Sequence, residues 1–221
     1  MMMKRDNCLL IIAGPSAVGK TTVAYKMIEN DPRFEFVRSV TTRQKRGDAY
    51  DAEYIYISIP QFKELIANGG VLEHTEYAGN YYGTPRSEVE RILSEGKLPL
   101  LVLDINGVCS LCANALGLSP CGIYVYDGID VMERRLYKRF IGDIPTEQGQ
   151  AKYESRVAQN RRDYSTLVDV QENFFTLIDN RGTPEQTAEK IQEIFASFMD
   201  GAEKDSEANA QIASALADSV K

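Results

Sequence analysis

The sequence of 221 residues is long enough to bury one sizeable hydrophobic core, and its 43% hydrophobic and 26% charged residues are ordinary for a globular protein. The formal net charge of −7 argues against general binding to nucleic acid. No apolar run approaches the roughly 18 residues that span a bilayer, and the first residues lack the apolar segment of a signal peptide. We therefore expect a cytoplasmic protein that binds neither nucleic acid nor a membrane.

The strongest motif follows the first apolar run, residues 9–13. Residues 14–21 read GPSAVGKT, which fits the pattern G-x-x-x-x-G-K-[ST], and a helical pattern starts at once. In such a loop the glycines let backbone N–H groups and the start of the helix approach a phosphate. We expect Lys20 to place its charge on the terminal phosphates of a nucleoside triphosphate, and the Thr21 hydroxyl to bind Mg²⁺. The predicted residues of this nucleotide site are Gly14, Pro15, Ser16, Ala17, Val18, Gly19, Lys20, Thr21 and Thr22, together with Asp179.

The four cysteines are Cys8, Cys109, Cys112 and Cys121. Cys109 and Cys112 have the CxxC spacing of many metal sites and Cys121 follows them, so a site with three thiolate ligands is conceivable. No second CxxC pair or nearby histidine completes such a site in the sequence. We expect free thiols that pack as small apolar groups, as in a reducing compartment.

Strand and helix patterns alternate along most of the chain. Helical patterns cover residues 20–30, 59–68, 87–95, 107–116, 129–164 with a break at 142–145, and 183–199. Strand patterns cover residues 9–13, 34–37, 54–57, 71–77, 98–103, 122–126 and 174–178. The unbroken apolar strands suit a parallel sheet that is covered on both faces. The sequence therefore predicts a three-layer α/β/α fold whose ligands lie beyond the carboxyl ends of the strands.

Two segments depart from this alternation. Residues 38–86 begin with a polar, basic stretch and then combine strands with one helix, which predicts a small α+β lobe inserted into the core. Residues 200–221 are rich in alanine and have only a thin apolar stripe, which predicts a mobile tail. The core would then consist of residues 1–37, 87–128 and 164–199.

Three further motifs lie downstream of the phosphate-binding loop: residues 39–46 (SVTTRQKR), Glu73, and residues 79–84 (GNYYGT). In their residues, and in their spacing from one another and from that loop, they resemble the motifs of the guanylate kinase family. The resemblance runs from about Leu9 to Phe198 and implies a P-loop fold with a GMP-binding lobe and a helical lid, here residues 129–163. It also implies transfer of the γ-phosphoryl group of ATP to GMP, and to dGMP, with Mg²⁺, by a monomer or a homodimer.

The resemblance assigns the recognition of GMP to the inserted lobe. Guanine presents N1–H and an amine as adjacent donors, which suit the carboxylate of Glu73, and its O6 suits the hydroxyl of Thr84, with Ser39 nearby. Arginines and tyrosine hydroxyls suit the acceptor phosphate. The residues implied for that phosphate are Arg43, Arg46, Tyr54 and Tyr82. Asp104, at the end of a core strand, would position Mg²⁺, bind in the acceptor site or cap a helix.

A transition state with charge spread over the transferred group needs cations around it. The resemblance assigns this role to Lys20, Arg43, Arg135, Arg139 and Arg156, the last three in the lid. The family usually has Asp-x-Asp where this chain has Val102 and Asp104, so the sequence supplies only one of those two carboxylates.

Two other functions stay open at this point. One is a non-catalytic guanylate-kinase-like module that binds peptides, although such modules typically have a degraded phosphate-binding loop and this loop is intact. The other is a kinase of the same fold that uses a different phosphorylated acceptor, which the replacement at Val102 leaves open.

Overall fold

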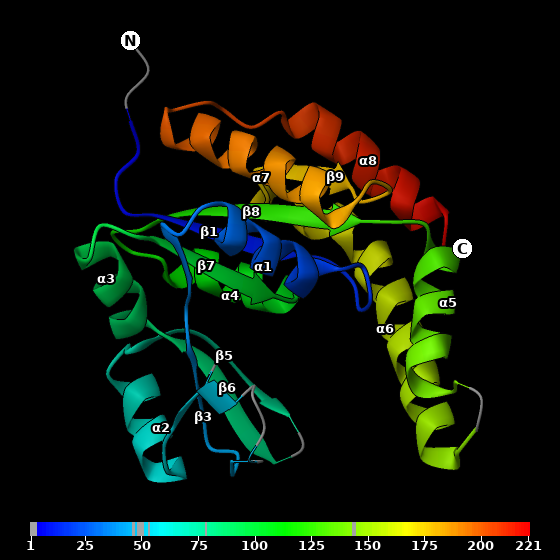
Figure 1. Ribbon diagram of the computed structural model, residues 1–221, viewed down its shortest axis with the longest axis horizontal. Coiled ribbons are helices and arrows are strands. Elements are labelled where there is room, and N and C mark those ends of the chain that lie inside the picture. Colours follow the sequence, from blue (N-terminus) through cyan, green and yellow to red (C-terminus); the bar gives the residue numbers. More distant parts are fainter. Residues whose placement is uncertain (1–3, 46, 48–50, 53, 78, 143–144) are drawn as a thin grey trace.

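The computed structural model describes residues 4–45, 47, 51–52, 54–77, 79–142 and 145–221 (Figure 1). Its core is a five-stranded sheet in the order β2-β7-β1-β8-β9, and all neighbouring strands are parallel. The strands are β1 Cys8–Ala13, β2 Phe34–Phe36, β7 Leu98–Leu103, β8 Ser119–Tyr126 and β9 Thr176–Asp179. The predicted parallel sheet is confirmed.

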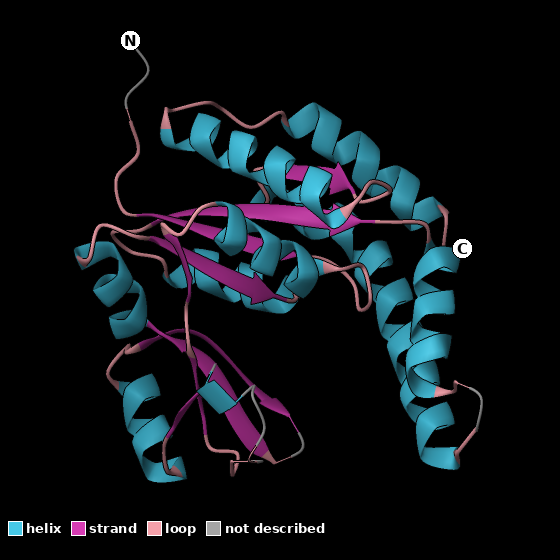
Figure 2. Ribbon diagram, viewed as in Figure 1, coloured by secondary structure: helices cyan, strands magenta, loops and turns pink. Residues whose placement is uncertain are grey.

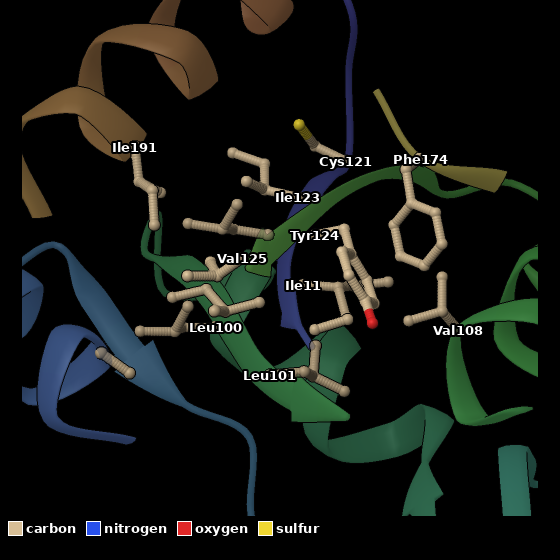
Figure 3. Close-up of a cluster of buried hydrophobic side chains, with 14 of the residues drawn as sticks. Ile11, Leu100, Leu101, Val108, Cys121, Ile123, Tyr124, Val125, Phe174 and Ile191 are labelled. Carbon is tan, nitrogen blue, oxygen red and sulfur yellow. The ribbon is translucent and has the colours of Figure 1, made fainter. Parts of the chain in front are cut away.

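Helices cover both faces of this sheet, because its central strands are apolar on both sides. Helices α1 (Lys20–Asn30) and α7 (Pro184–Met199) pack together on one face, and α4 (Ile105–Asn114) and α6 (Glu147–Val170) lie on the other (Figure 2). Figure 3 shows the packing between them: Ile123 and Val125 of β8 extend toward Ile191 of α7, whereas Tyr124 extends toward Val108 of α4. The fold therefore has the predicted three layers.

A second sheet stands apart from the core in Figure 1, with the strand order β4-β3-β6-β5. Its strands are β3 Ser39–Thr41, β4 Tyr54–Tyr56, β5 Val71–Tyr77 and β6 Asn80–Pro85, and helix α2 (Ile59–Ala67) packs on it. Phe62 of α2 is fully buried against Val40 and Val71, so this sheet has a small hydrophobic core of its own. Strands β3 and β6 were absent from the predicted elements. For β6, Gly79 and Asn80 predict a turn, but the segment that follows pairs with β5 and so forms a strand.

Helix α3 (Arg86–Ser94) leads from this lobe back to the core. After β8, helices α5 (Ile129–Phe140) and α6 lie side by side and extend away from the sheet, at the lower right of Figure 1. Tyr164 anchors α6 to the core, since its buried hydroxyl donates a 2.6 Å hydrogen bond to the carbonyl of Asp127. The short helix η2 (Gln171–Asn173) follows. None of the described helices is long and apolar enough to cross a membrane.

The predicted mobile tail at residues 200–221 is wrong, because most of this segment forms helix α8 (Ser206–Asp218), which packs against α6, η2 and β9. The narrow apolar stripe suffices because Ala213, which is fully buried, lets the helix approach closely. Asn209 is buried as well, and its Nδ2 lies 3.2 Å from the carbonyl oxygen of Phe174 and 3.3 Å from that of Phe175. Lys204 fixes the start of the segment through the Glu172 carbonyl at 2.8 Å.

Candidate active site

The phosphate-binding loop connects β1 to α1 and has an unusual backbone. Gly14 and Gly19 have φ angles of 145° and 110°, and Ala17, with a φ of 66°, is also left-handed. A Cβ atom on Gly14 would lie 2.2 Å from the carbonyl oxygen of Val125, so only glycine fits there. Helix α1 begins at Lys20, directly after the second glycine. The N-terminus of this helix and the backbone N–H groups of the loop therefore belong to the same potential anion site.

Lys20 lies within this loop, and its Nζ donates hydrogen bonds to the carbonyls of Gly14 at 2.7 Å and Pro15 at 2.9 Å. Burial lowers the pKa of Lys20 to about 8, against the opposing effect of the nearby carboxylates of Asp163 and Asp104. A partly desolvated ammonium that donates to two backbone carbonyls is well placed to exchange them for phosphate oxygens.

Two buried asparagines hold the loop from elements distant in the sequence. Asn160 of α6 bonds to both backbone groups of Ser16, and Nδ2 of Asn180 donates to the carbonyl of Val18 at 2.6 Å. Thr187 in turn donates to Oδ1 of Asn180 at 2.6 Å. Sequence reasoning missed both asparagines, because an isolated asparagine in a helix or after a strand gives no signal of a contact about 150 residues away.

The prediction that Asp179 contacts the nucleotide is not supported by its position. Its carboxylate turns to Arg181 instead, accepting from the backbone N–H at 2.8 Å and pairing with Nε at 2.9 Å. The next residue, Asn180, faces the loop and lines the adjoining cavity. Alternation along the end of β9 explains this shift of one position.

A cavity of about 550 Å³ lies beside the loop, and all three predicted lid arginines line it. Nη1 of Arg135 pairs with Asp127 at 3.2 Å and donates to the carbonyl of Ala17 at 3.3 Å, so this arginine already touches the loop. The lining residues include Ser16, Ala17, Val18, Gly19, Lys20, Thr21, Thr22, Arg135, Arg139, Arg156 and Asn180. The arrangement surrounds a potential anion with backbone N–H groups and four cationic side chains.

A second cavity, of about 840 Å³, lies between the loop, the end of β7 and α6. It shares Lys20, Arg139 and Arg156 with the first cavity, and its lining also includes Val102, Asp104 and Asp163. Asp104 caps α4 by accepting the N–H of Gly107 at 2.8 Å, which is one of the three roles considered for it. The buried carboxylate of Asp163, which sequence reasoning missed, has a pKa raised by desolvation.

In the lobe, Glu73 and Thr84 are register partners on β5 and β6, and the Thr84 hydroxyl donates to Glu73 at 2.6 Å. Both residues are buried, and desolvation raises the pKa of Glu73. A hydroxyl has one hydrogen, so Thr84 would have to turn it away from Glu73 to donate to O6 of guanine. A cavity of about 240 Å³ is lined by Ser39, Tyr54 and Thr84 of the lobe and by Thr21 and Val102 of the core.

Arg43 occupies the middle of an aromatic cluster in the lobe. Its guanidinium lies 5.0 Å from the ring centroid of Tyr54 and 5.5 Å from that of Tyr56, and the ring of Tyr82 is 6.2 Å from that of Tyr54. Nη2 of Arg43 also contacts Asp51 at 3.3 Å and the Tyr56 hydroxyl at 3.1 Å, two residues that sequence reasoning did not include. Arg46, the other predicted phosphate ligand, lies outside the described residues.

Comparisons with known proteins agree with this geometry. A family model described as guanylate kinase matches residues 6–198. A guanylate kinase of Lactococcus lactis subsp. lactis is 38% identical over 125 residues, which are 56% of this chain and 59% of that protein, so the aligned chain spans less than two thirds of that relative. One of Latilactobacillus sakei is 33% identical over 175 residues, 76% of this chain and 84% of the relative.

A solved structure points the same way. The crystal structure of guanylate kinase from Anaplasma phagocytophilum superposes with a TM-score of 0.57 and 25% sequence identity, covering 90% of this chain and 89% of that one. The family model spans most of the chain, and it contains the phosphate-binding loop, the lobe and the arginine-bearing helices. The chain therefore belongs to the guanylate kinase family.

Proposed function

We propose that this protein transfers the γ-phosphoryl group of ATP to GMP, and to dGMP, giving ADP and GDP or dGDP. The observation that carries the proposal is the cavity in which Thr21 of the phosphate-binding loop faces Ser39, Tyr54 and Thr84 of the lobe. A donor held at the loop and an acceptor held in the lobe would meet there. Each of the two sites has the chemistry of one substrate.

On the donor side, the loop N–H groups and the start of α1 would hold the phosphates of ATP, with Lys20 on the β- and γ-phosphates. The hydroxyl of Thr21 supplies an oxygen ligand of the kind that Mg²⁺ requires. Thr21 is also accessible, because it is exposed and borders both the donor cavity and the cavity shared with the lobe. When bound, Mg²⁺ would neutralise part of the phosphate charge. Thr21 would hold it together with phosphate and water oxygens.

On the acceptor side, Glu73 would accept the N1–H and amine of guanine. Adenine lacks that amine and presents a donor in place of O6, so it would leave the buried Glu73 and Thr84 without partners. Arg43, Tyr54 and Tyr82 would bind the phosphate of GMP, and Arg43 would exchange its contact with Asp51 for that phosphate. Asp104, which lines the second cavity, would contact the acceptor nucleotide there.

Transfer between two anionic phosphates needs positive charge at the transferred group. Lys20, Arg139 and Arg156 line both cavities beside the loop, and Arg135 touches the loop carbonyl of Ala17. These side chains would stabilise the charge in the transition state. Closure of α5 and α6 over the substrates would also keep water from acting as the acceptor.

A cytoplasmic location is part of the proposal. All four cysteines are free, as is usual in a reducing compartment.

An assay of ADP formation with MgATP and a series of acceptors tests the proposed function. We expect turnover with GMP and dGMP, and turnover with AMP and UMP lower by at least about 100-fold, because those bases leave the carboxylate unpaired. No GMP-dependent turnover would favour the peptide-binding module. Equal turnover with AMP would point to a kinase with a different acceptor.

A further inference from the structure

Asn160 of α6 forms two hydrogen bonds with the backbone of one residue of the phosphate-binding loop, Ser16. Its side chain is fully buried. Oδ1 accepts a hydrogen bond from the Ser16 N–H at 2.8 Å, and Nδ2 donates to the Ser16 carbonyl at 3.0 Å. Both ends of one amide are thus engaged by one residue of the loop. Such a pair of bonds fixes the orientation of the peptide groups on either side of Ser16 as well as their position.

The next residue shows why the loop needs this support. Ala17 has a φ of 66°, in the left-handed region that alanine rarely adopts. A strained residue keeps such a conformation only when its surroundings hold it there. Asn160 holds Ser16 before it, and Asn180 holds the carbonyl of Val18 after it at 2.6 Å. The left-handed residue therefore lies between two buried asparagines from different elements.

We propose that Asn160 is a positioning residue of the phosphate-binding loop, which keeps the loop N–H groups directed at the phosphates before ATP binds. A loop that is ordered in advance binds more tightly, because its ordering does not have to be driven by the ligand. Asn160 also lies one helical turn after Arg156, so the same contact sets the distance between that arginine and the loop. The inference rests on the proposed function, since it takes ATP as the ligand of the loop.

Binding of ATP and of GMP to the separate sites, each measured by calorimetry without the other nucleotide, tests this role. For Asn160→Ala we expect the Kd of ATP to rise at least 10-fold, while the Kd of GMP changes less than twofold. Asn209→Ala is the matched control. Asn209 is also buried and holds two backbone carbonyls, but these precede β9, at the end of the sheet opposite the phosphate-binding loop. The control should lower the unfolding temperature and leave both Kd values unchanged.

Unchanged ATP affinity in folded Asn160→Ala, or an equal loss of GMP affinity, would overturn the proposal. Should the alanine variant fail to fold, Asn160→Ser takes its place with the same expected result, because its smaller polar side chain leaves room for water to satisfy the Ser16 backbone. The proposed function is judged separately, by GMP-dependent turnover of the wild-type protein. A wild type that binds ATP without such turnover contradicts that function, whereas the comparison of ATP affinities still decides the role of Asn160.

Discussion

Glu73 and Thr84 form a buried pair across strands β5 and β6, joined by a hydrogen bond of 2.6 Å from the threonine hydroxyl to Oε1 of the glutamate. Desolvation raises the pKa of Glu73, and the bond from Thr84 only partly opposes that shift. Buried carboxylates whose charged form is disfavoured by desolvation are often found at functional sites.

Glu73→Gln should weaken guanine recognition. The amide presents one donor toward a base edge that offers donors, so we expect kcat/KM for GMP to fall by roughly 100-fold while ATP affinity is kept. Steady-state kinetics with GMP as the varied substrate measures this. An unchanged KM for GMP would remove Glu73 from the acceptor site.

The same substitution should leave the protein as stable or more stable. The pKa of Glu73 is raised in the folded state, so its ionised form costs folding free energy at neutral pH, and that cost disappears as the pH falls through the folded pKa. The neutral amide removes the cost, by about 1 kcal/mol. Urea denaturation at pH 7 should show the change, and a large loss of stability would mean that the fold itself depends on the charged carboxylate.

Lys20 should give the reaction a limit at high pH. Burial lowers its pKa to about 8, so the free enzyme loses the ammonium charge as the pH rises through that value. The charged groups that face it are Asp163 from α6, Asp104 at the end of β7 and Arg156. We expect kcat/KM for ATP to fall above pH 8, and kcat to hold to higher pH because bound phosphate stabilises the ammonium. A flat profile of kcat/KM up to pH 10 would contradict this.

Local patterns in the sequence predicted those helices and strands that are determined by their own residues rather than by contacts with distant segments. The start of α1 at Lys20 follows from the glycine turn before it, and β7 follows from its unbroken apolar run. Glu73 and Thr84, which the resemblance assigns to one base, are neighbours in the structure and are joined by a hydrogen bond. Arg135, Arg139 and Arg156, which the resemblance assigns to the lid, line one cavity in the structure.

Contacts between distant segments could not be predicted in this way. Asn160 and Asn180 reach the loop from positions 144 and 162 residues away, and no local pattern marks them. Strand β6 exists because β3 and β5 pair with it on either side. Helix α8 is stabilised by burial of Ala213 and Asn209 against other elements, which its thin apolar stripe does not reveal.

Asn209→Ala tests the docking of α8. The substitution leaves the carbonyls of Phe174 and Phe175 without the amide that binds them, so the free energy of unfolding should fall by about 2 kcal/mol. Urea denaturation followed by circular dichroism measures the change. An unaltered midpoint would mean that residues 200–221 are as loosely held as their composition suggests.

Tyr124 offers a test of the core. Among the described residues its fully buried hydroxyl has no hydrogen-bond partner, and Figure 3 shows the ring within the cluster of hydrophobic side chains. Tyr124→Phe removes an unsatisfied polar group at little cost in packing. The free energy of unfolding should therefore increase by about 1 kcal/mol, and the unfolding temperature should rise with it. A drop in that temperature would show that the hydroxyl is hydrogen-bonded in solution.

The stoichiometry of products tests the central claim most directly, because it distinguishes phosphoryl transfer from hydrolysis. With purified protein, MgATP and GMP, quantitative chromatography should find ADP and GDP formed in equal amounts, and neither formed when GMP is omitted. ADP without GDP, or the same amount of ADP with and without GMP, would contradict the account of a donor loop and an acceptor lobe that act on one phosphoryl group.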